Sequence, residues 1–357
     1  MSALLFVVLA AGNCKLWTEF ANRIHAFPWQ CKTLRRVRWL HDAGIVLGCV
    51  AAGFAAFGEW RTQRPTLWWS LVAVWSLGYA KLVYDAGRHL FRSDPPGVVR
   101  GETTTVDVAA ELGERPTGDG PARALARVPG NDSFRIDVER KTFALPGYPA
   151  TEPLRILHLT DWHFSGTPDM RFYERATELC LSLEYDIVVF TGDLVDRLSL
   201  LDWLPDTLGR VDAPLGRYFV LGNHDRMAGM DQTRAAMLAA GWTDASAGRR
   251  DFAHAGGRFA LTGDERPWAE SDSPAVADAF HIALAHSPDR WPDALARGAV
   301  LTLAGHNHGG QVVLPLIGPV YSPSAHGVRY AAGLFREGDA FLHVGRGLGG
   351  IHPLRLR

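Results

Sequence analysis

The stretch LAGHNHGGQ, residues 303–311, places His306 and His308 two positions apart, directly before a pair of glycines. An apolar run, AVLTLA (299–304), leads into it and predicts a short buried strand. A histidine pair in a loop is by itself weak evidence for a metal site. Its meaning depends on which other side chains reach the same place in the fold.

Four other apolar segments share this pattern, because each predicts a strand and is followed, directly or after one glycine, by Asp, Asn or His. They are LRILHLT (154–160) before Asp161, Trp162 and His163; DIVVFT (186–191) before Gly192 and Asp193; RYFVL (217–221) before Gly222, Asn223, His224 and Asp225; and HIALA (281–285) before His286. Segments with helical spacing lie between several of them, at 172–183, 201–208 and 234–240. Alternating strands and helices predict a largely parallel, covered sheet, whose carboxyl edge is where ligands bind. The five strand ends therefore predict one common site.

The order of these motifs resembles the calcineurin-like metallophosphoesterase superfamily. The matching elements are DWH (161–163), GDLVD (192–196), GNHD (222–225), His286 and GHNH (305–308), within roughly residues 152–353. The GGQ after the last motif resembles a bacterial membrane-associated subgroup with a GHxHGGQ motif. The resemblance implies an α/β fold, a four-layer α/β/β/α sandwich with a two-metal site between its sheets. It also implies hydrolysis of a phosphoester by a hydroxide that bridges two divalent ions.

Carried over to this chain, the resemblance implies seven metal ligands. Asp161, His163 and His308 would hold one ion, Asn223, His286 and His306 the other, and Asp193 would bridge the two. His224 would assist departure of the leaving group, and Asp225 would orient His224. Asp196 has two open interpretations, either as a residue that orients the loop or a ligand, or as a surface aspartate.

The chemistry of these residues agrees with such a centre. Two divalent ions bring about +4, the carboxylates of Asp161 and Asp193 bring −2, and a hydroxide brings −1, which leaves roughly +1 to face an anionic phosphoester. Alternate residues of an extended segment face the same way, about 6.5 Å apart, so His306 and His308 could each reach a different ion. The set has no thiolate and suits Mn, Fe, Zn or Co without selecting one.

The substrate stays open at this point. A phosphomonoester and a phosphodiester are both compatible with the motifs, and a first alternative is a nucleotide-lipid pyrophosphatase of the UDP-diacylglucosamine type. A second alternative is an inactive metal-binding membrane scaffold, against which the complete ligand set and His224 argue. A third, a zinc amidohydrolase, would place its HxH pair on an early strand of a barrel, whereas here the pair comes last.

The N-terminal part of the chain differs from the rest. Three stretches lack charge, at 1–14, 43–58 and 66–80, and Trp60, Trp68, Trp69 and Trp75 are typical of a membrane-interface belt. Fifteen helical residues reach only about 22 Å against a bilayer core of roughly 30 Å, so buried helices of a soluble domain are the alternative. We expect a hydrophobic helical region at 1–92 that contacts a lipid bilayer, a Pro- and Gly-rich linker at 93–133, and the catalytic domain at 134–357.

Charge adds a topology and excludes some functions. Basic residues gather between the first two stretches and after the third, whereas only Arg61 and Arg64 lie between the second and third. The positive-inside rule then predicts a cell (inner) membrane protein with its catalytic domain on the cytoplasmic side. The net charge of −1 gives no nucleic-acid-binding signature. Four cysteines without a CxxC pair argue against a disulfide framework or a cysteine zinc site.

Overall fold

The computed structural model describes residues 2–29, 31–121, 123–350, 352 and 354–356. The chain forms two compact units. The first, here called the helical unit, comprises Met1–Ser93 together with Val312–Arg329. The second, the sandwich unit, comprises Asp94–Gln311 together with Tyr330–Arg357. The chain therefore leaves the sandwich unit directly after the GGQ motif and returns to it 18 residues later.

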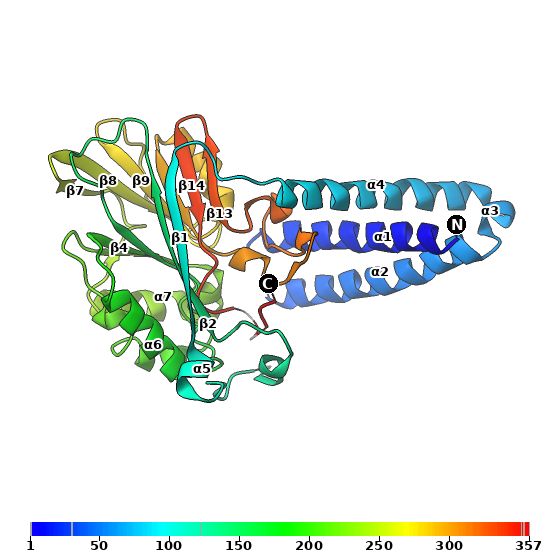
Figure 1. Cartoon of the computed structure of the whole chain (residues 1–357), viewed down its shortest axis with the longest axis horizontal. Helices are drawn as coiled ribbons and strands as arrows, with labels where there is room; N and C mark the ends of the chain where they lie inside the picture. The colour runs from blue at the N-terminus through cyan, green and yellow to red at the C-terminus, as the bar shows by residue number, and fades with distance from the viewer. Residues whose placement is uncertain (1, 30, 122, 351, 353, 357) are drawn as a thin grey trace. The chain divides into compact units, whose positions relative to one another are not determined.

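Three long helices run side by side in the helical unit (Figure 1). They are α1 (Ser2–His25), α2 (Cys31–Phe57) and α4 (Pro65–Leu90), and the short α3 (Trp60–Gln63) joins the last two. Ser2–His25 and Lys32–Phe57 are long and apolar enough to cross a membrane, whereas α4 is not among the described helices that meet this criterion. Large apolar side chains such as Leu4, Leu47 and Leu77 are exposed on all three helices.

Charged residues pair inside the helical unit. The Lys15 ammonium lies 2.7 Å from a carboxylate oxygen of Glu19 on α1 and 2.7 Å from one of Asp85 on α4. Lys81 also contacts Asp85, at 2.5 Å. Buried charges are tolerated where they are paired, so this cluster explains why charged residues occur within otherwise apolar helices.

Residues 312–329 pack against the C-terminal ends of α1 and α4. They begin with a small antiparallel pair, β11 (Val313–Leu314) and β12 (Gly318–Pro319). The backbone N–H of Ser322 donates to Oδ1 of Asn22, and the rings of Tyr321 and His25 meet edge to face. The expected boundary of 1–92 did not include this segment, because nothing in its sequence indicates a return to the N-terminal helices.

The first sheet of the sandwich unit is parallel throughout. Its order is β3 (Ile156–Leu159), β4 (Ile187–Thr191), β5 (Arg217–Val220) and β6 (Thr243–Asp244). Alternate residues of the buried β4 point to opposite faces. Val188 and Phe190 pack in the core beneath α6 (Met170–Leu181) and α7 (Asn223–Ala239), whereas Ile187 and Val189 pack toward the second sheet.

The second sheet is mixed and has six strands. In sheet order they are β13 (Gly333–Glu337), β14 (Ala340–Val344), β10 (Leu301–Ala304), β9 (Phe280–Ala285), β8 (Gly257–Asp264) and β7 (Arg250–His254). The four central strands are parallel, and β13 and β7 are antiparallel edges. Trp291, which begins α8 (Trp291–Ala296), packs on the outer face against Ala304 and Leu342. Helices therefore cover both outer faces, and the predicted α/β/β/α sandwich is confirmed.

The structure differs from the expected linker at 93–133. Residues 98–107 form β1 (Val98–Asp107), which pairs along its length with β2 (Arg135–Phe143) in an antiparallel hairpin. The short helix α5 (Val108–Leu112) follows, capped by the Asp107 carboxylate, which accepts the N–H of Ala110. The Pro- and Gly-rich composition of this stretch indicated a linker. The pairing of β1 was not foreseen because its partner strand begins more than 25 residues further along the chain.

Candidate metal centre

The seven candidate ligands all lie at the carboxyl ends of strands or in the turn that follows. Their ligand atoms form two groups, each within 4.8 Å: the first is Asp161, His163, Asp193 and His308, and the second is Asp193, His286 and His306. Asp193 belongs to both groups, and Oδ1 of Asn223 lies 3.1 Å from Nε2 of His286 in the second. Six of the seven side chains are buried, and Asn223 is half-buried.

The tautomers of two histidines follow from their outer hydrogen bonds. Nδ1 of His286 donates to the carbonyl oxygen of Thr191 at 2.7 Å, and Nδ1 of His163 lies 3.2 Å from both carboxylate oxygens of Asp196. These oxygens only accept, so the proton sits on Nδ1 and the lone pair of each neutral ring is on Nε2.

Ring nitrogens and carboxylate oxygens converge at the centre of each group. Nε2 of His163 lies 3.2 Å from Nε2 of His308, and Nε2 of His286 lies 3.1 Å from Nδ1 of His306. The same Nε2 of His286 is 3.2 Å from Oδ2 of Asp193. Buried acceptors that face one another in this way are satisfied by a cation, so the residues fit a divalent metal.

The backbone at the ligands is unusual. Asp161, His163, Asp193, His306 and His308 all have φ between 49° and 71°, the left-handed region that non-glycine residues rarely adopt. The strands end before these residues, at Leu159 and Ala304. The expectation that His306 and His308 lie on an extended segment is therefore wrong, although the two residues do join different groups. Such backbone strain is typical of functional sites.

A glycine is required where the last motif meets the first. A Cβ atom on Gly305 would lie 1.9 Å from Oγ1 of Thr160 and 2.3 Å from Oδ2 of Asp161. That Thr160 hydroxyl donates to the same Asp161 oxygen at 2.6 Å, and the backbone N–H of His306 donates to both carboxylate oxygens. Close approach of the backbone thus fixes the orientation of the Asp161 carboxylate.

Comparison with known proteins agrees with this geometry. The family model described as calcineurin-like phosphoesterase matches residues 154–310. The uncharacterized metallophosphoesterase YkuE of Bacillus subtilis (strain 168) is 32% identical over 220 residues, which cover 56% of this chain and 74% of that protein. The phosphodiesterase YaeI of Escherichia coli (strain K12) is 29% identical over 212 residues, 57% of this chain and 78% of that protein.

The chain belongs to the calcineurin-like phosphoesterase family. It is a metallophosphoesterase, a hydrolase of phosphoric ester bonds that has clustered His and Asp residues for a divalent metal. A shorter match concerns the UDP-2,3-diacylglucosamine pyrophosphatase LpxG of Chlamydia trachomatis, which is 41% identical over 75 residues. This match covers 20% of this chain and 22% of that protein.

Asp225 has a different place in this phosphoesterase from the one we expected. Its carboxylate accepts the backbone N–H groups of Asp193, Leu194, Val195 and Gly222 at 2.9–3.1 Å. The carboxylate that contacts Nδ1 of His224, at 2.5 Å, belongs instead to another residue, Asp196. Asp225 joins two loops that contribute candidate ligands. Asp225 directly follows His224 in the sequence, whereas Asp196 reaches His224 only after folding, so the local sequence could not reveal that contact.

The carboxylates around His224 favour its protonated form. Burial alone would lower the pKa of His224, but the charges of Asp193 and Asp196 outweigh burial and raise the pKa to about 9. Burial opposes ionisation of Asp196, yet His163 and His224 hold the pKa of this carboxyl below its usual range. Sequence reasoning left Asp196 undecided, and the structure places it between a candidate ligand and the candidate acid.

One aromatic neighbour of the site carried no signal in the sequence. The ring of Trp268 lies 5.3 Å from the ring of His286 and 5.0 Å from that of His306, measured between centroids. Trp268 is 8% exposed and lies beyond the end of β8, in the segment after Asp264. It forms an apolar wall beside the second group of ligands. Such a wall excludes water and strengthens electrostatic interactions nearby.

Proposed function

We propose that this phosphoesterase hydrolyses its substrate at a centre of two divalent ions. Asp161, His163 and His308 hold the first ion, Asn223, His286 and His306 hold the second, and Asp193 bridges both. The observation that supports this most strongly is the position of Asp193, whose carboxylate belongs to both groups of ligand atoms. Ions bound there would supply Lewis-acid chemistry and lower the pKa of water to about 7, so that hydroxide is available as nucleophile.

His224 acts as the general acid in this proposal. With its pKa raised to about 9, its ring is protonated at neutral pH, and Nδ1 is engaged by Asp196. Nε2 is then the atom that donates a proton to the departing oxygen of the substrate. Asp196 is a positioning residue, since it holds both the acid His224 and the candidate ligand His163 in orientation.

A lipid-linked phosphoester is the substrate class that we favour. Two observations support it: the apolar helices of the helical unit, and the local similarity to a pyrophosphatase that acts on UDP-2,3-diacylglucosamine. The helices would keep the enzyme in the cell (inner) membrane through residues 1–92. In the proposed topology α1, α2 and α4 all cross the bilayer, and the basic residues between α1 and α2 and after α4 lie on the cytoplasmic side together with the sandwich unit. The second candidate function is accordingly a nucleotide-lipid pyrophosphatase.

Purified full-length protein tests this function. We expect the protein to hydrolyse a chromogenic phosphodiester only when Mn, Fe, Zn or Co is added. Turnover rates for phosphomonoesters, phosphodiesters and UDP-diacylglucosamine then rank the candidate substrates. Asp193→Ala should abolish the activity and reduce the metal content toward zero. A wild-type protein that binds metal but hydrolyses none of these compounds would support the inactive scaffold instead.

A further inference from the structure

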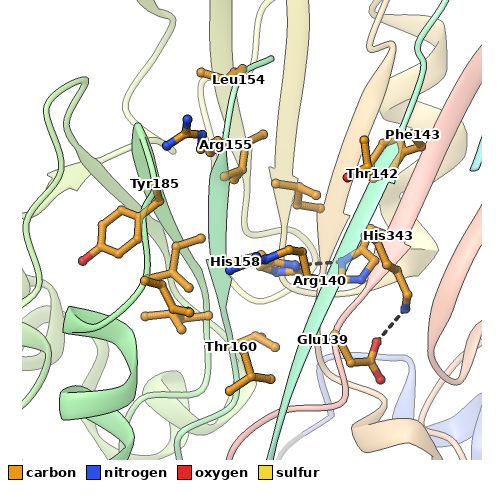
Figure 2. A pocket seen from close by; sticks show the side chains of 18 of the residues that line it. Glu139, Arg140, Thr142, Phe143, Leu154, Arg155, His158, Thr160, Tyr185 and His343 are labelled. Atoms are coloured by element: carbon orange, nitrogen blue, oxygen red, sulfur yellow. Dashed lines mark hydrogen bonds and ion pairs between the residues drawn. The ribbon is translucent and has the colours of Figure 1, made fainter. Parts of the chain in front are cut away.

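The sandwich unit contains a large cavity of about 1120 Å³, and none of the candidate ligands is among the residues that line it. It opens between β2 and β3, and Figure 2 shows side chains from both strands around it. Among the described residues β2 pairs only with β1, and β3 pairs only with β4, so the facing edges of the two strands are left unpaired. The space is open to solvent on one side, so a ligand can enter it.

The deep wall of the cavity is apolar. It includes Leu157 of β3, Leu179 of α6, and Phe259, Phe280 and Leu301 of the second sheet. Val138 of β2 also lines the cavity and is half-buried, but it packs in neither of the two large cores of the sandwich. The volume is at or above the upper end of the range for ligand sites, which are mostly apolar with a few polar groups.

One polar group inside the cavity has an unused ring nitrogen. Nδ1 of His158 lies 3.0 Å from Nδ1 of His343, and Nε2 of His158 lies 2.9 Å from Oγ1 of Thr191 (Figure 2). Burial lowers the pKa of both rings, that of His343 to about 3, so both are neutral at pH 7. In either tautomer Nε2 of His343 has no hydrogen-bond partner within the part of the chain that the structure describes.

A cation without a counter-ion stands at the opening. Arg140 projects from β2 at the level of the two histidines in Figure 2, is exposed, and has no ion pair or hydrogen bond with any described side chain. Its neighbours are paired, because Lys141 contacts Glu139 and Arg155 contacts Glu184. An unpaired guanidinium beside an apolar cavity matches a ligand that is apolar at one end and anionic at the other.

The cavity also shares a wall with the candidate metal centre. Thr160, Trp162 and Gly347 all line it. Thr160 donates to the Asp161 carboxylate, and a Cβ atom on Gly347 would lie 2.7 Å from that of Asp161. A ligand in the cavity therefore lies behind the same short loops that orient the candidate metal ligands.

We infer that this cavity is the binding site for the acyl chain of a lipid-linked phosphoester substrate, with Arg140 and His343 contacting the polar part of that lipid. The inference rests on the proposed function and adds the place where the lipid part is recognised. The apolar wall takes the methylene chain, the free nitrogen of His343 faces the ester or its ordered water, and Arg140 faces an anionic oxygen.

Chain length provides the test. Full-length protein in nanodiscs would be assayed with nitrophenyl phosphodiesters of hexanoyl-, octanoyl- and decanoylglycerol, below their critical micelle concentrations, and with a diester that has no acyl chain. KM should fall by up to about fourfold for each added methylene that enters the cavity, since burial of one methylene contributes about 0.8 kcal/mol. The kcat for the chain-free diester sets the baseline.

Variants on the hairpin locate the effect. Val138→Trp should obstruct the part of the cavity that β2 lines and weaken the dependence on chain length, while leaving turnover of the chain-free diester within about twofold. Thr103→Trp is the matched control, because Thr103 is exposed on the partner strand β1 and does not line the cavity. Arg140→Gln should raise KM for all acylated diesters about tenfold, whereas the exposed Arg258→Gln on β8 should not.

Three results would overturn the inference. In the first, hexanoyl and decanoyl substrates have the same KM in the wild type. In the second, Val138→Trp keeps the full dependence on chain length. In the third, vesicles of phosphatidylglycerol stimulate hydrolysis of the chain-free diester, and of the variants only Val138→Trp abolishes the stimulation. This result would assign the cavity to a lipid of the bilayer. If the chain-free diester is still hydrolysed in any of these cases, the proposed function stands. If the protein does not hydrolyse this diester at all, both the proposed function and the inference about the cavity are refuted.

Discussion

Asp196→Asn should lower the activity of this phosphoesterase at pH 8 and leave its activity at pH 6 nearly unchanged. The Asp196 carboxylate lies 2.5 Å from Nδ1 of His224 and contributes to the pKa of about 9. The difference from the usual value of 6.5 corresponds to about 3 kcal/mol in favour of the protonated ring. Because this pKa is raised, the acid is present below it, and activity is lost as the pH rises through it.

The expected magnitude follows from the protonated fraction of His224. At pH 8 about 90% of the rings are protonated with a pKa of about 9, but only about 3% with a pKa of 6.5, so the rate falls about 30-fold. At pH 6 the two fractions are nearly equal, at almost 100% and about 75%. Asp193 still raises the pKa in the variant, which makes 30-fold the upper limit.

The assay is kcat/KM between pH 5.5 and about 9.5 for two phosphodiesters, one with an alcohol as leaving group and one with nitrophenol. An alcohol needs a proton on departure, so its reaction should lose most, whereas nitrophenolate departs readily without one. Metal content is measured in parallel. An equal loss at pH 6 and pH 8 would refute the reasoning, and a loss of metal would show that Asp196 acts mainly through His163.

Four further predictions follow from the site and the helices. His224→Ala should retain the wild-type metal content yet slow turnover by about 10²–10⁴-fold, as for removal of a general acid, and loss of metal by this variant would mean that His224 is a ligand. Removal of metal with a chelator should lower the Tm by about 5 °C, and a Tm that does not respond to metal would contradict a metal site in the folded protein. Gly305→Ala should destabilise the fold by about 1–3 kcal/mol and weaken metal binding, because its Cβ overlaps the Thr160 hydroxyl, whereas Gly101→Ala, which meets nothing within 4 Å, should be neutral. Alkaline phosphatase fused to the C-terminus should be inactive in cells, and an active fusion would place the sandwich unit outside the cytoplasm.

The sequence predicted the parts of the site that depend on local order. Apolar runs located β3, β4, β5, β9 and β10 to within two residues, and the polar residues after each run are the ones that meet in space. This works because the carboxyl ends of parallel strands share one edge of a sheet. The helix α7 begins at Asn223, earlier than its apolar spacing indicated, so the GNHD motif forms its first turn.

Features that depend on distant partners were not predictable. The choice between Asp196 and Asp225 as partner of His224 is decided by loops that follow different strands. The left-handed backbone of the ligands was not predictable from residue type, because Asp and His adopt it more often than most residues but still only in a small fraction of cases. The hairpin of β1 and β2 was hidden for a similar reason, because neither strand is strongly apolar and each is stable only with the other.

The passage of residues 312–329 through the helical unit affects how this enzyme can be produced. A truncated chain that starts at residue 94 would retain every candidate ligand but lose Asn22 and His25, the contacts of Ser322 and Tyr321. The ends of that segment adjoin Gln311, whose N–H donates to the carbonyl oxygen of His308, and Tyr330, whose carbonyl oxygen accepts from the side-chain amide of Asn307. The segment between Gln311 and Tyr330 is therefore packed on the helices, and a version without them would need a redesigned bridge between these two residues rather than a simple deletion.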